Sequence, residues 1–125
     1  MKDILFGVEV FAVMGCAMAV HRTFGSGFLE GVYGDTLAVE FRRKGIPFER
    51  ERRFPILYKG IQFDRSYIAD VVCYSQIIVE LKAIDFLSKK EIAQLLNYLK
   101  ETGLRLGLLI DFGSVGKLGW KRMIV

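Results

Sequence analysis

A strongly apolar segment near the middle of the chain carries two opposite charges at alternate positions. Residues 77–83 run Ile-Ile-Val-Glu-Leu-Lys-Ala, and their β-branched start predicts a strand. Side chains alternate between the two faces of a strand, so Glu80 and Lys82 share one face. A buried charge is costly unless it is paired or bound to a metal ion. The segment is therefore either a salt-bridged pair on a solvated sheet face or part of a polar site.

A second apolar segment contains a single acid. Residues 67–73 are apolar and β-branched around Asp70, and residues 74–76 predict a three-residue hairpin loop between the two strands. In that register Asp70 lies opposite Glu80, and we expect Asp70, Glu80 and Lys82 to gather on one face. A two-residue turn would instead put Asp70 on the wrong face. Two adjacent carboxylates repel unless a cation lies between them, and oxygen ligands of this kind suit Mg²⁺ or Mn²⁺.

Helical and strand patterns alternate along the rest of the chain. Helices are predicted over residues 4–22, 28–44 and 88–101, and strands over residues 48–58, 61–63, 67–73, 77–83, 104–110 and 120–125. Ser88 and Glu91 form a capping-box pattern at the start of the third helix. Gly45 and Gly103 follow two of the helices as C-caps. This order predicts one α+β (α/β) layered domain over residues 1–125.

Composition excludes several classes of protein. The chain has 125 residues, 52% of them hydrophobic and only two proline, which excludes a disordered chain or a proline-rich linker. Two distant cysteines and a single histidine supply neither a zinc ligand set nor a Ser/His/Asp site. Lys and Arg number 18 against 14 Asp and Glu, and this net charge of +4 is compatible with a polyanion partner without requiring one. Reduced cysteines fit a cytoplasmic protein.

The nearly apolar run over residues 6–20 admits two interpretations, a buried helix or a targeting segment. Asp3 lies beside Lys2 in what would be the basic start of a signal, and Glu9 interrupts the apolar run. The run is also shorter than the roughly 20 residues that span a bilayer. We therefore favour a buried first helix and expect no membrane association. The high apolar content further predicts a homodimer face.

Several motifs resemble one nuclease superfamily. Asp70, nine intervening residues and then Glu80-Leu81-Lys82 resemble the motif of the PD-(D/E)xK nuclease superfamily. Residues 27–33, Gly-Phe-Leu-Glu-Gly-Val-Tyr, resemble the GxxExxY signature of the small bacterial and archaeal family of that name. Residues 20–22, 108–112 and 121–122 are also similar to that family, so the resemblance covers nearly the whole chain.

The resemblance implies a fold, a reaction and a set of site residues. The fold is an αβββαβ core, a mixed central sheet flanked by helices with the metal site at one edge. The reaction is Mg²⁺- or Mn²⁺-dependent hydrolysis of phosphodiester bonds in nucleic acid, DNA more than RNA. Asp70 and Glu80 are implied as the main metal ligands and Glu30 as an auxiliary acid. Lys82 is implied to orient or activate water. The implied catalytic residues are Glu30, Asp70, Glu80, Lys82, Gln94 and Tyr98, the last two as a QxxxY motif beside the site.

Considered without the resemblance, three of these residues have ordinary structural explanations. With Gly27 as N-cap, Glu30 is the third helical residue, where an acid favours the helix dipole. Gln94 and Tyr98 share a helix face that borders the buried stripe, so they could simply pack on the sheet. A non-catalytic nucleic-acid- or protein-binding module on a nuclease fold remains the alternative function.

Basic residues near the predicted site suggest where a polyanion would bind. Arg50 and Arg52 alternate with Glu49 and Glu51, which predicts one basic and one acidic strand face. The other interpretation is a charged edge strand that blocks aggregation. The candidates for nucleic-acid binding are Arg50, Arg52, Lys89 and Lys90.

Overall fold

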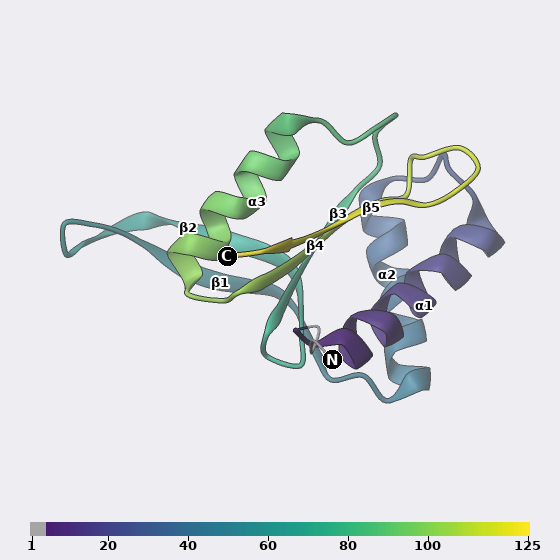
Figure 1. Ribbon diagram of the computed structural model, residues 1–125, viewed down its shortest axis with the longest axis horizontal. Helices are drawn as coiled ribbons and strands as arrows, with labels where there is room; N and C mark the ends of the chain where they lie inside the picture. Colours follow the sequence, from purple (N-terminus) through teal and green to yellow (C-terminus); the bar gives the residue numbers. More distant parts are fainter. Residues whose placement is uncertain (1–4) are drawn as a thin grey trace.

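The computed structural model describes residues 5–125, and the chain order of its elements is two helices, three strands, a helix and two strands (Figure 1). The elements are α1 (Gly7–Phe24), α2 (Glu30–Lys44), β1 (Phe48–Tyr58), β2 (Ile61–Cys73), β3 (Ile77–Lys82), α3 (Lys89–Thr102), β4 (Leu106–Asp111) and β5 (Gly119–Ile124). The strands form one sheet in the order β1-β2-β3-β4-β5. This arrangement confirms the predicted α+β fold class.

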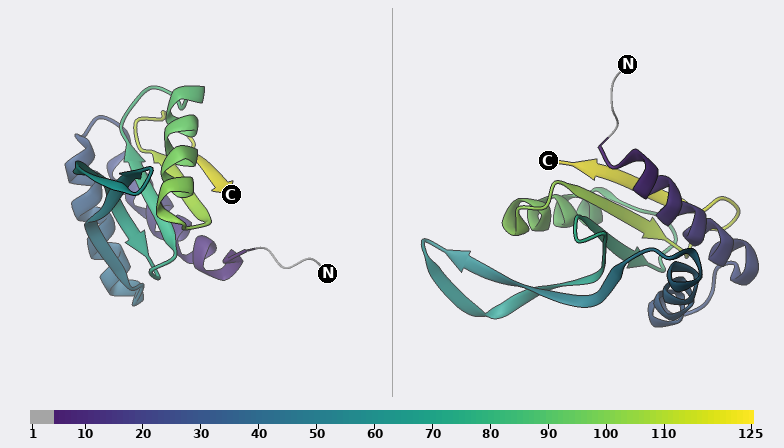
Figure 2. Two further views of the ribbon diagram at one scale, coloured as in Figure 1. Left: turned by 90° about the vertical axis from the view of Figure 1, so that its left-hand side faces the viewer. Right: turned by 90° about the horizontal axis from the view of Figure 1, so that it is seen from below.

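The sheet is mixed, because one pair of strands is parallel. β1 pairs antiparallel with β2, and β2 pairs antiparallel with β3. β3 pairs parallel with β4, and β5 pairs antiparallel with β4. Parallel neighbours need a crossover connection, and α3 supplies it between β3 and β4. Helices α1 and α2 cover one face of the sheet and α3 covers the other, as the side view shows (Figure 2).

The face under α1 and α2 is filled by a fully apolar core. Tyr33 of α2 is completely buried and stacks on Phe112, with ring centroids 4.6 Å apart and planes 8° apart. Its hydroxyl donates a hydrogen bond to the Gly25 carbonyl at 2.5 Å. His21 is also buried, and its Nε2 bonds the Ser114 carbonyl at 2.9 Å. These aromatic and polar contacts hold the ends of α1 and α2 against the loop after β4.

The strands that carry Asp70 and Glu80, β2 and β3, are joined by the predicted three-residue loop. Tyr74 and Ser75 both adopt φ 56°, the left-handed conformation that a tight hairpin turn requires, and Gln76 N donates to the Cys73 carbonyl at 3.0 Å. The register that follows, Val71 opposite Val79, is the one the three-residue loop predicts. The capping box at Ser88 is also confirmed.

Several predicted boundaries are wrong. Ile4, the predicted start of the first helix, lies outside the described residues, and α1 continues to Phe24. Helix α2 begins at Glu30 with Leu29 as N-cap, so Gly27 does not cap it. The predicted gap between residues 61–63 and 67–73 does not exist, because β2 is one continuous strand. β4 begins at Leu106 rather than two residues earlier.

A long hairpin projects beyond the sheet. β3 pairs with β2 only at Val71, Val72 and Cys73, so most of β2 has β1 as its sole partner. We call residues 52–67 the β1–β2 arm. Figures 1 and 2 show it passing beside α3 and extending away from α1 and α2. The arm therefore leaves the sheet immediately beside Asp70.

Candidate active site

Glu80 and Lys82 lie side by side on the face of β3 that α3 covers. Both are half-buried, and they line one small pocket together with residues of α3 and β4. The lining residues are Glu80, Lys82, Glu91, Gln94, Leu95, Tyr98 and Leu109. The sequence-predicted pairing of the ExK motif with the QxxxY residues is therefore present in space. Within the described chain Lys82 forms no salt bridge, which leaves its ammonium group available to a ligand.

Tyr67 holds the Glu80 carboxylate and was missed by sequence reasoning. Its hydroxyl donates a hydrogen bond to Glu80 Oε1, and its ring stacks on Tyr98 with centroids 3.7 Å apart and planes 9° apart. Tyr67 is buried at the root of the β1–β2 arm. The available signal was its position three residues before Asp70 in the same predicted strand. Its contact with Glu80 depends on where the two strands diverge, which the pattern does not specify.

Asp70 lies at the point where β2 separates from β3. Its Oδ2 accepts a hydrogen bond from Leu81 N at 2.8 Å. The Asp70 carboxylate is therefore the acceptor for a backbone N–H of β3, where a backbone carbonyl would be the acceptor in a regular strand pair. The acid also lines a second pocket, on the α2 side of the sheet, which includes Glu30 and Arg50. Asp70 thus reaches the split between two strands rather than lying flat on one face.

The prediction that Asp70, Glu80 and Lys82 occupy one face is only partly correct. Ala69 packs in the core beside α3, whereas Val71 packs in the core under α1 and α2. Strict alternation would put both on the same face, so β2 changes face at Asp70. The partner strand has its own irregularity there, since Glu51 adopts φ 54° directly opposite. This local break turns Asp70 toward the α2 side.

The same break separates the two arginines of β1. Arg50 points toward α2, where its Nη1 donates to Asp35 Oδ1 at 2.8 Å. Arg52 points to the other face, with its guanidinium 4.7 Å from the ring centroid of Phe54. The prediction of a single basic face is therefore wrong, because the left-handed Glu51 interrupts the alternation.

Glu30 and Arg50 meet across the α2-side pocket, which holds about 100 Å³. Glu30 is exposed at the first position of α2. Gly34, one turn later, is close-packed: a Cβ atom there would lie 2.8 Å from an Arg50 guanidinium nitrogen. A larger residue at this position would require the Arg50 guanidinium to shift. The close approach of Arg50 is therefore a packing reason for a glycine inside α2, where its helix-propensity cost is roughly 1 kcal/mol.

The electrostatics of Glu80 depend on its neighbours. Burial, followed by the negative charge of Asp70, raises the pKa of Glu80 to about 8. The hydrogen bond from Tyr67 opposes this rise but does not cancel it. Burial and the Glu80 charge together raise the pKa of the Tyr67 hydroxyl, so it remains a donor. Ionisation of both acids together is therefore unfavourable in the metal-free protein, and a bound cation would favour it.

Two further acids shape the segment around Lys82. Glu91 accepts hydrogen bonds from Ser88 N at 3.0 Å and Ser88 Oγ at 2.8 Å, and these bonds lower the pKa of Glu91. Asp111 is fully buried, and its Oδ1 accepts from Ile84 N at 3.0 Å and Gly113 N at 2.9 Å. Both acids anchor the connection that leaves β3, and neither was singled out as catalytic from the sequence.

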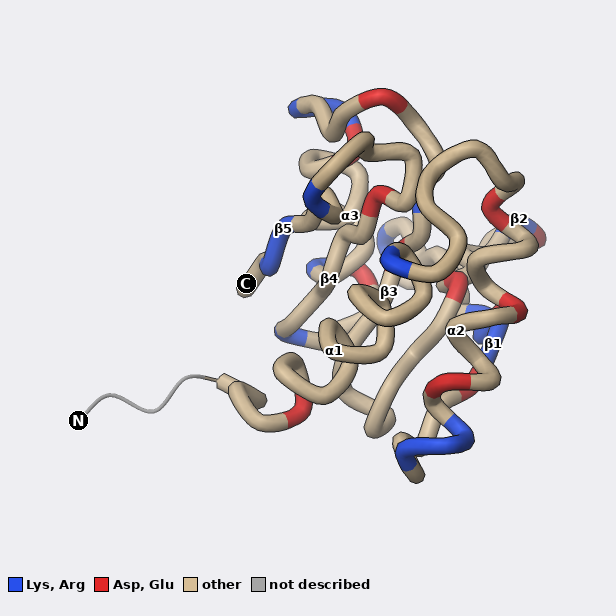
Figure 3. Tube along the Cα trace, turned by 90° about the vertical axis from the view of Figure 1, so that its right-hand side faces the viewer, with Lys and Arg blue, Asp and Glu red and all other residues tan. Residues whose placement is uncertain are grey.

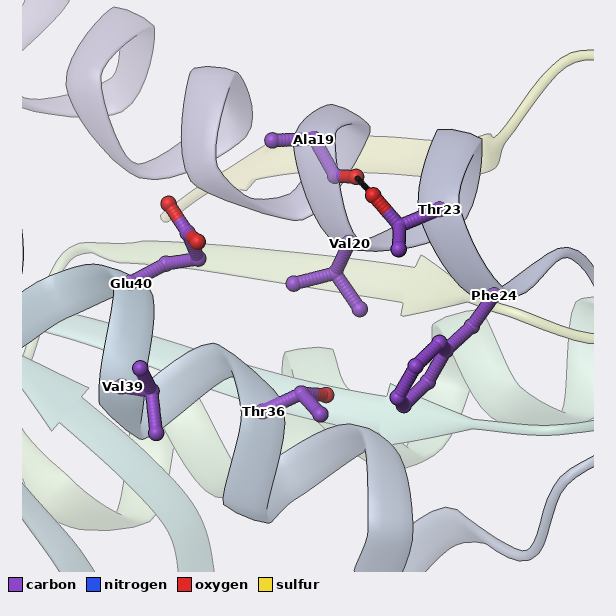
Figure 4. Close-up of a pocket in the computed structure, with 7 residues that line it drawn as sticks. All are labelled: Ala19, Val20, Thr23, Phe24, Thr36, Val39 and Glu40. Carbon is purple, nitrogen blue, oxygen red and sulfur yellow. Dashed lines mark hydrogen bonds between the residues drawn. The ribbon is translucent and has the colours of Figure 1, made fainter.

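Another hollow, between α1 and α2, has the wrong chemistry for a catalytic site. It holds about 190 Å³ and is lined by apolar and hydroxyl side chains with one acid, Glu40 (Figure 4). Thr23 Oγ1 in its wall donates to the Ala19 carbonyl at 3.1 Å. No second charged group faces Glu40 in the lining of this hollow. Its structure supports packing between helices rather than catalysis.

Comparison with known proteins identifies the family. The family model described as "PD-(D/E)XK nuclease superfamily" matches residues 8–123, nearly the whole chain. The chain belongs to the PD-(D/E)XK nuclease superfamily. No curated protein matches it significantly.

One solved structure is similar in fold to this PD-(D/E)XK chain. It is described as "Crystal structure of SSO0001", with a TM-score of 0.55 and 18% sequence identity. The alignment covers 75% of this chain and 48% of the other, so this chain spans about half the length of that structure. At this identity the likeness shows the fold alone. Among the described residues, no helix is both long and apolar enough to cross a membrane.

PD-(D/E)XK nucleases generally use divalent metal ions, and two acids here fit such an ion. Asp70 and Glu80 present hard oxygen donors, and a bound cation would oppose the effects of burial and of the Asp70 charge that raise the pKa of Glu80. Within residues 5–125 no group of three His, Cys, Asp or Glu side chains is arranged to hold a metal. Mg²⁺ is commonly held by one or two carboxylates and keeps several waters. The donor set therefore fits Mg²⁺ through two ligands better than a closed protein cage.

Proposed function

We propose that this chain is a metal-dependent nuclease of the GxxExxY family that hydrolyses phosphodiester bonds, in DNA more readily than in RNA. One observation carries the proposal: Glu80 and Lys82 share a pocket with Gln94 and Tyr98, while burial and then the charge of Asp70 raise the pKa of Glu80. This combination concentrates a carboxylate pair and an unpaired ammonium beside one strand. Such groups suit an anionic ester substrate.

The proposed roles follow from the contacts of each residue. Asp70 and Glu80 would hold Mg²⁺ or Mn²⁺, which supplies Lewis-acid charge to the phosphate and lowers the pKa of water. Lys82 stabilises negative charge that develops on the phosphate oxygens. Tyr67 fixes the orientation of the Glu80 carboxylate through its hydrogen bond.

The remaining site residues take supporting roles. Gln94 is exposed and Tyr98 is half-buried at the pocket, which holds only about 10 Å³. A phosphodiester would therefore lie at the mouth of this pocket, within reach of the Gln94 amide. Glu30 is proposed as an auxiliary acid on the α2 side of Asp70, beside Arg50.

Phosphate binding is proposed for four basic residues around this site. Arg50 adjoins Asp70 in the α2-side pocket, whereas Arg52 lies on the α3 face of the arm. Lys89 and Lys90 are exposed in the first turn of α3. Charges on both sides of the strand split would hold a backbone that passes over it.

We also propose that the chain forms a homodimer in the cytoplasm. Val8 and Phe11 of α1 are each 81% exposed, and Met18 lies further along the same helix. Figure 3 shows that α1 carries almost no charged positions, unlike the end of α2. An exposed apolar helix of this kind suits a second copy. Both cysteines are free and buried, which fits a reducing compartment.

Cleavage of labelled nucleic acid tests the proposed reaction. Single- and double-stranded DNA and RNA are incubated with Mg²⁺ or Mn²⁺ and with wild type, Glu80→Gln or Lys82→Met protein, purified identically. We expect each substitution to reduce the rate by about 10²–10⁴-fold, while Glu40→Gln, far from the strand split, retains it. Equal activity in all four proteins would indicate a contaminant. No activity in wild type would leave the non-catalytic binding module.

A further inference from the structure

The outer part of the β1–β2 arm exposes apolar and aromatic side chains. Tyr58 and Ile61 are directly opposed in the register and are 60% and 63% exposed. Leu57 and Phe63 beside them are 49% and 47% exposed. A projecting hairpin with such side chains is prone to aggregation when nothing covers it. The end of the arm therefore has the composition of an interaction surface.

Packed side chains connect this surface to the candidate active site. Starting at the pocket, Tyr98 stacks on Tyr67, and Tyr67 stacks on Phe54 with ring centroids 5.9 Å apart. Ile56 packs against the same cluster. The pairing of β1 with β2 shifts register between Pro55 and Leu57, and Leu57 N donates a hydrogen bond to Glu101 Oε1 of α3 at 3.0 Å. This track of packed aromatic and apolar side chains, in which Tyr67 and Phe54 are buried, thus connects the residues around Glu80 to the base of the exposed outer arm.

Positive charge accompanies the aromatic rings along this track. The guanidinium of Arg52 lies 4.7 Å from the centroid of Phe54, and the ammonium of Lys59 lies 5.4 Å from that of Tyr58. Residues 52–67 carry four basic side chains and one acidic one: Arg52, Arg53, Lys59 and Arg65 against Asp64. The arm is therefore net positive, which is complementary to a phosphate backbone.

We propose that the exposed outer part of the β1–β2 arm binds single-stranded nucleic acid and guides it toward Glu80. Unpaired bases stack on Tyr58, and Lys59 and Arg52 neutralise neighbouring phosphates. A single strand fits better than a duplex, because only unstacked bases offer their faces to an aromatic side chain. The inference rests on the proposed nuclease function for its substrate class, since the track ends at the proposed catalytic pocket.

Fluorescence anisotropy of a labelled oligothymidylate tests this binding directly. The titration is done with a chelator present, so that the strand stays intact and binding is measured apart from cleavage. We expect Tyr58→Ala to weaken binding at least about fivefold, the equivalent of losing one stacked base at about 1 kcal/mol, and Tyr58→Phe to retain it. Lys59→Gln should reduce the slope of log affinity against log salt by about 0.7.

A highly exposed apolar residue on another surface provides the control. Val115, in the loop between β4 and β5, is 90% exposed, and Val115→Ala should bind the oligonucleotide as wild type does. Thermal unfolding followed by circular dichroism checks that Tyr58→Ala is folded, which we expect for a side chain at the end of a hairpin.

Three results would overturn the proposal. The first is wild-type affinity in a folded Tyr58→Ala protein, and the second is an equal loss in Val115→Ala. The third is a change in molecular mass for Tyr58→Ala in sedimentation, which would make the arm a contact between copies. The cleavage assay separates this inference from the proposed function. If Tyr58→Ala cleaves with unchanged KM and the cleavage still depends on Glu80, the arm does not bind the substrate, and the proposed nuclease function is unaffected. If the oligonucleotide binds through Tyr58 but no cleavage occurs, the proposed nuclease function is wrong, and binding by the arm still stands.

Discussion

The two faces of the sheet differ in what they bury. The face under α1 and α2 is filled by apolar and aromatic side chains, with Tyr33 and Phe112 stacked and completely buried. The face under α3 has a smaller core, and beside it lie a carboxylate, an ammonium and two stacked tyrosines. The face under α1 and α2 thus contributes most of the apolar core, and the face under α3 combines a smaller core with the charged and aromatic groups of the candidate active site.

This division explains how a short chain tolerates charges in a central strand. Val79 and Leu81 of β3 are buried under α1 and α2, which secures the strand in the sheet. Glu80 and Lys82 alternate with them and face the less completely covered side. The burial of Val79 and Leu81 therefore offsets the free-energy cost of partly desolvating Glu80 and Lys82.

The largest effect that separates the faces should come from the core under α1 and α2. We expect Phe112→Ala to lower the free energy of unfolding by about 3–5 kcal/mol, because a completely buried ring leaves a cavity. Urea unfolding measures it. Phe86→Ala, at a phenylalanine that is 74% exposed, should change the same quantity by less than about 0.5 kcal/mol. Similar losses in both proteins would contradict the assignment of stability to the first face.

The free energy of unfolding should depend on pH through Glu80 on the α3 face. The pKa of Glu80 rises from 4.5 to about 8, first by burial and then by the charge of Asp70. Because the folded-state pKa lies above the unfolded one, the protonated carboxyl stabilises the fold at low pH. That contribution is lost as the pH rises through about 8.

The measurement is urea unfolding of the metal-free protein at a series of pH values. We expect the free energy of unfolding to fall by on the order of a few kcal/mol between about pH 5 and pH 8 and then to level off. Glu80→Gln should remove most of this fall, and Glu40→Gln should keep it. An unchanged pH slope in Glu80→Gln would disprove the role of Glu80.

A smaller effect should come from Asp111, which links the two faces at the end of β4. Asp111→Ala leaves two backbone donors, Ile84 N and Gly113 N, without their acceptor, and we expect a loss of about 2–3 kcal/mol. Asp111→Asn keeps the accepting oxygen and should stay within about 1 kcal/mol of wild type. Thermal and urea unfolding of both variants check this. Equal losses for Ala and Asn would mean that the negative charge, not the acceptor, matters.

Local patterns explain why much of the site could be predicted from the sequence. Alternation assigned Glu80 and Lys82 to one face, and the three-residue loop fixed the register of Asp70. The capping box at Ser88 marked the start of α3, which carries Gln94. Each of these features depends on neighbours within a few residues, so the sequence pattern specifies it.

The parts that could not be predicted depend on backbone irregularities and on distant contacts. Nothing in the residue types of β1 indicates that Glu51 adopts a left-handed conformation, and that break turns Asp70 and separates the two arginines. Tyr67 was missed because its partner Glu80 lies 13 positions away across a strand split. The continuous β2 was missed because the polar residues of the arm resemble a loop.

Calorimetric titration of Mg²⁺ into the metal-free protein at about pH 8 tests the central claim most directly, because it measures the cation site without requiring turnover. We predict binding to wild type that is abolished by Asp70→Asn or Glu80→Gln, and weakened less by Glu30→Gln, whose side chain is exposed on the α2 side. Glu40→Gln should bind as wild type does. Wild-type protein that binds no Mg²⁺, or binding that persists unchanged in Asp70→Asn and Glu80→Gln, would contradict the account.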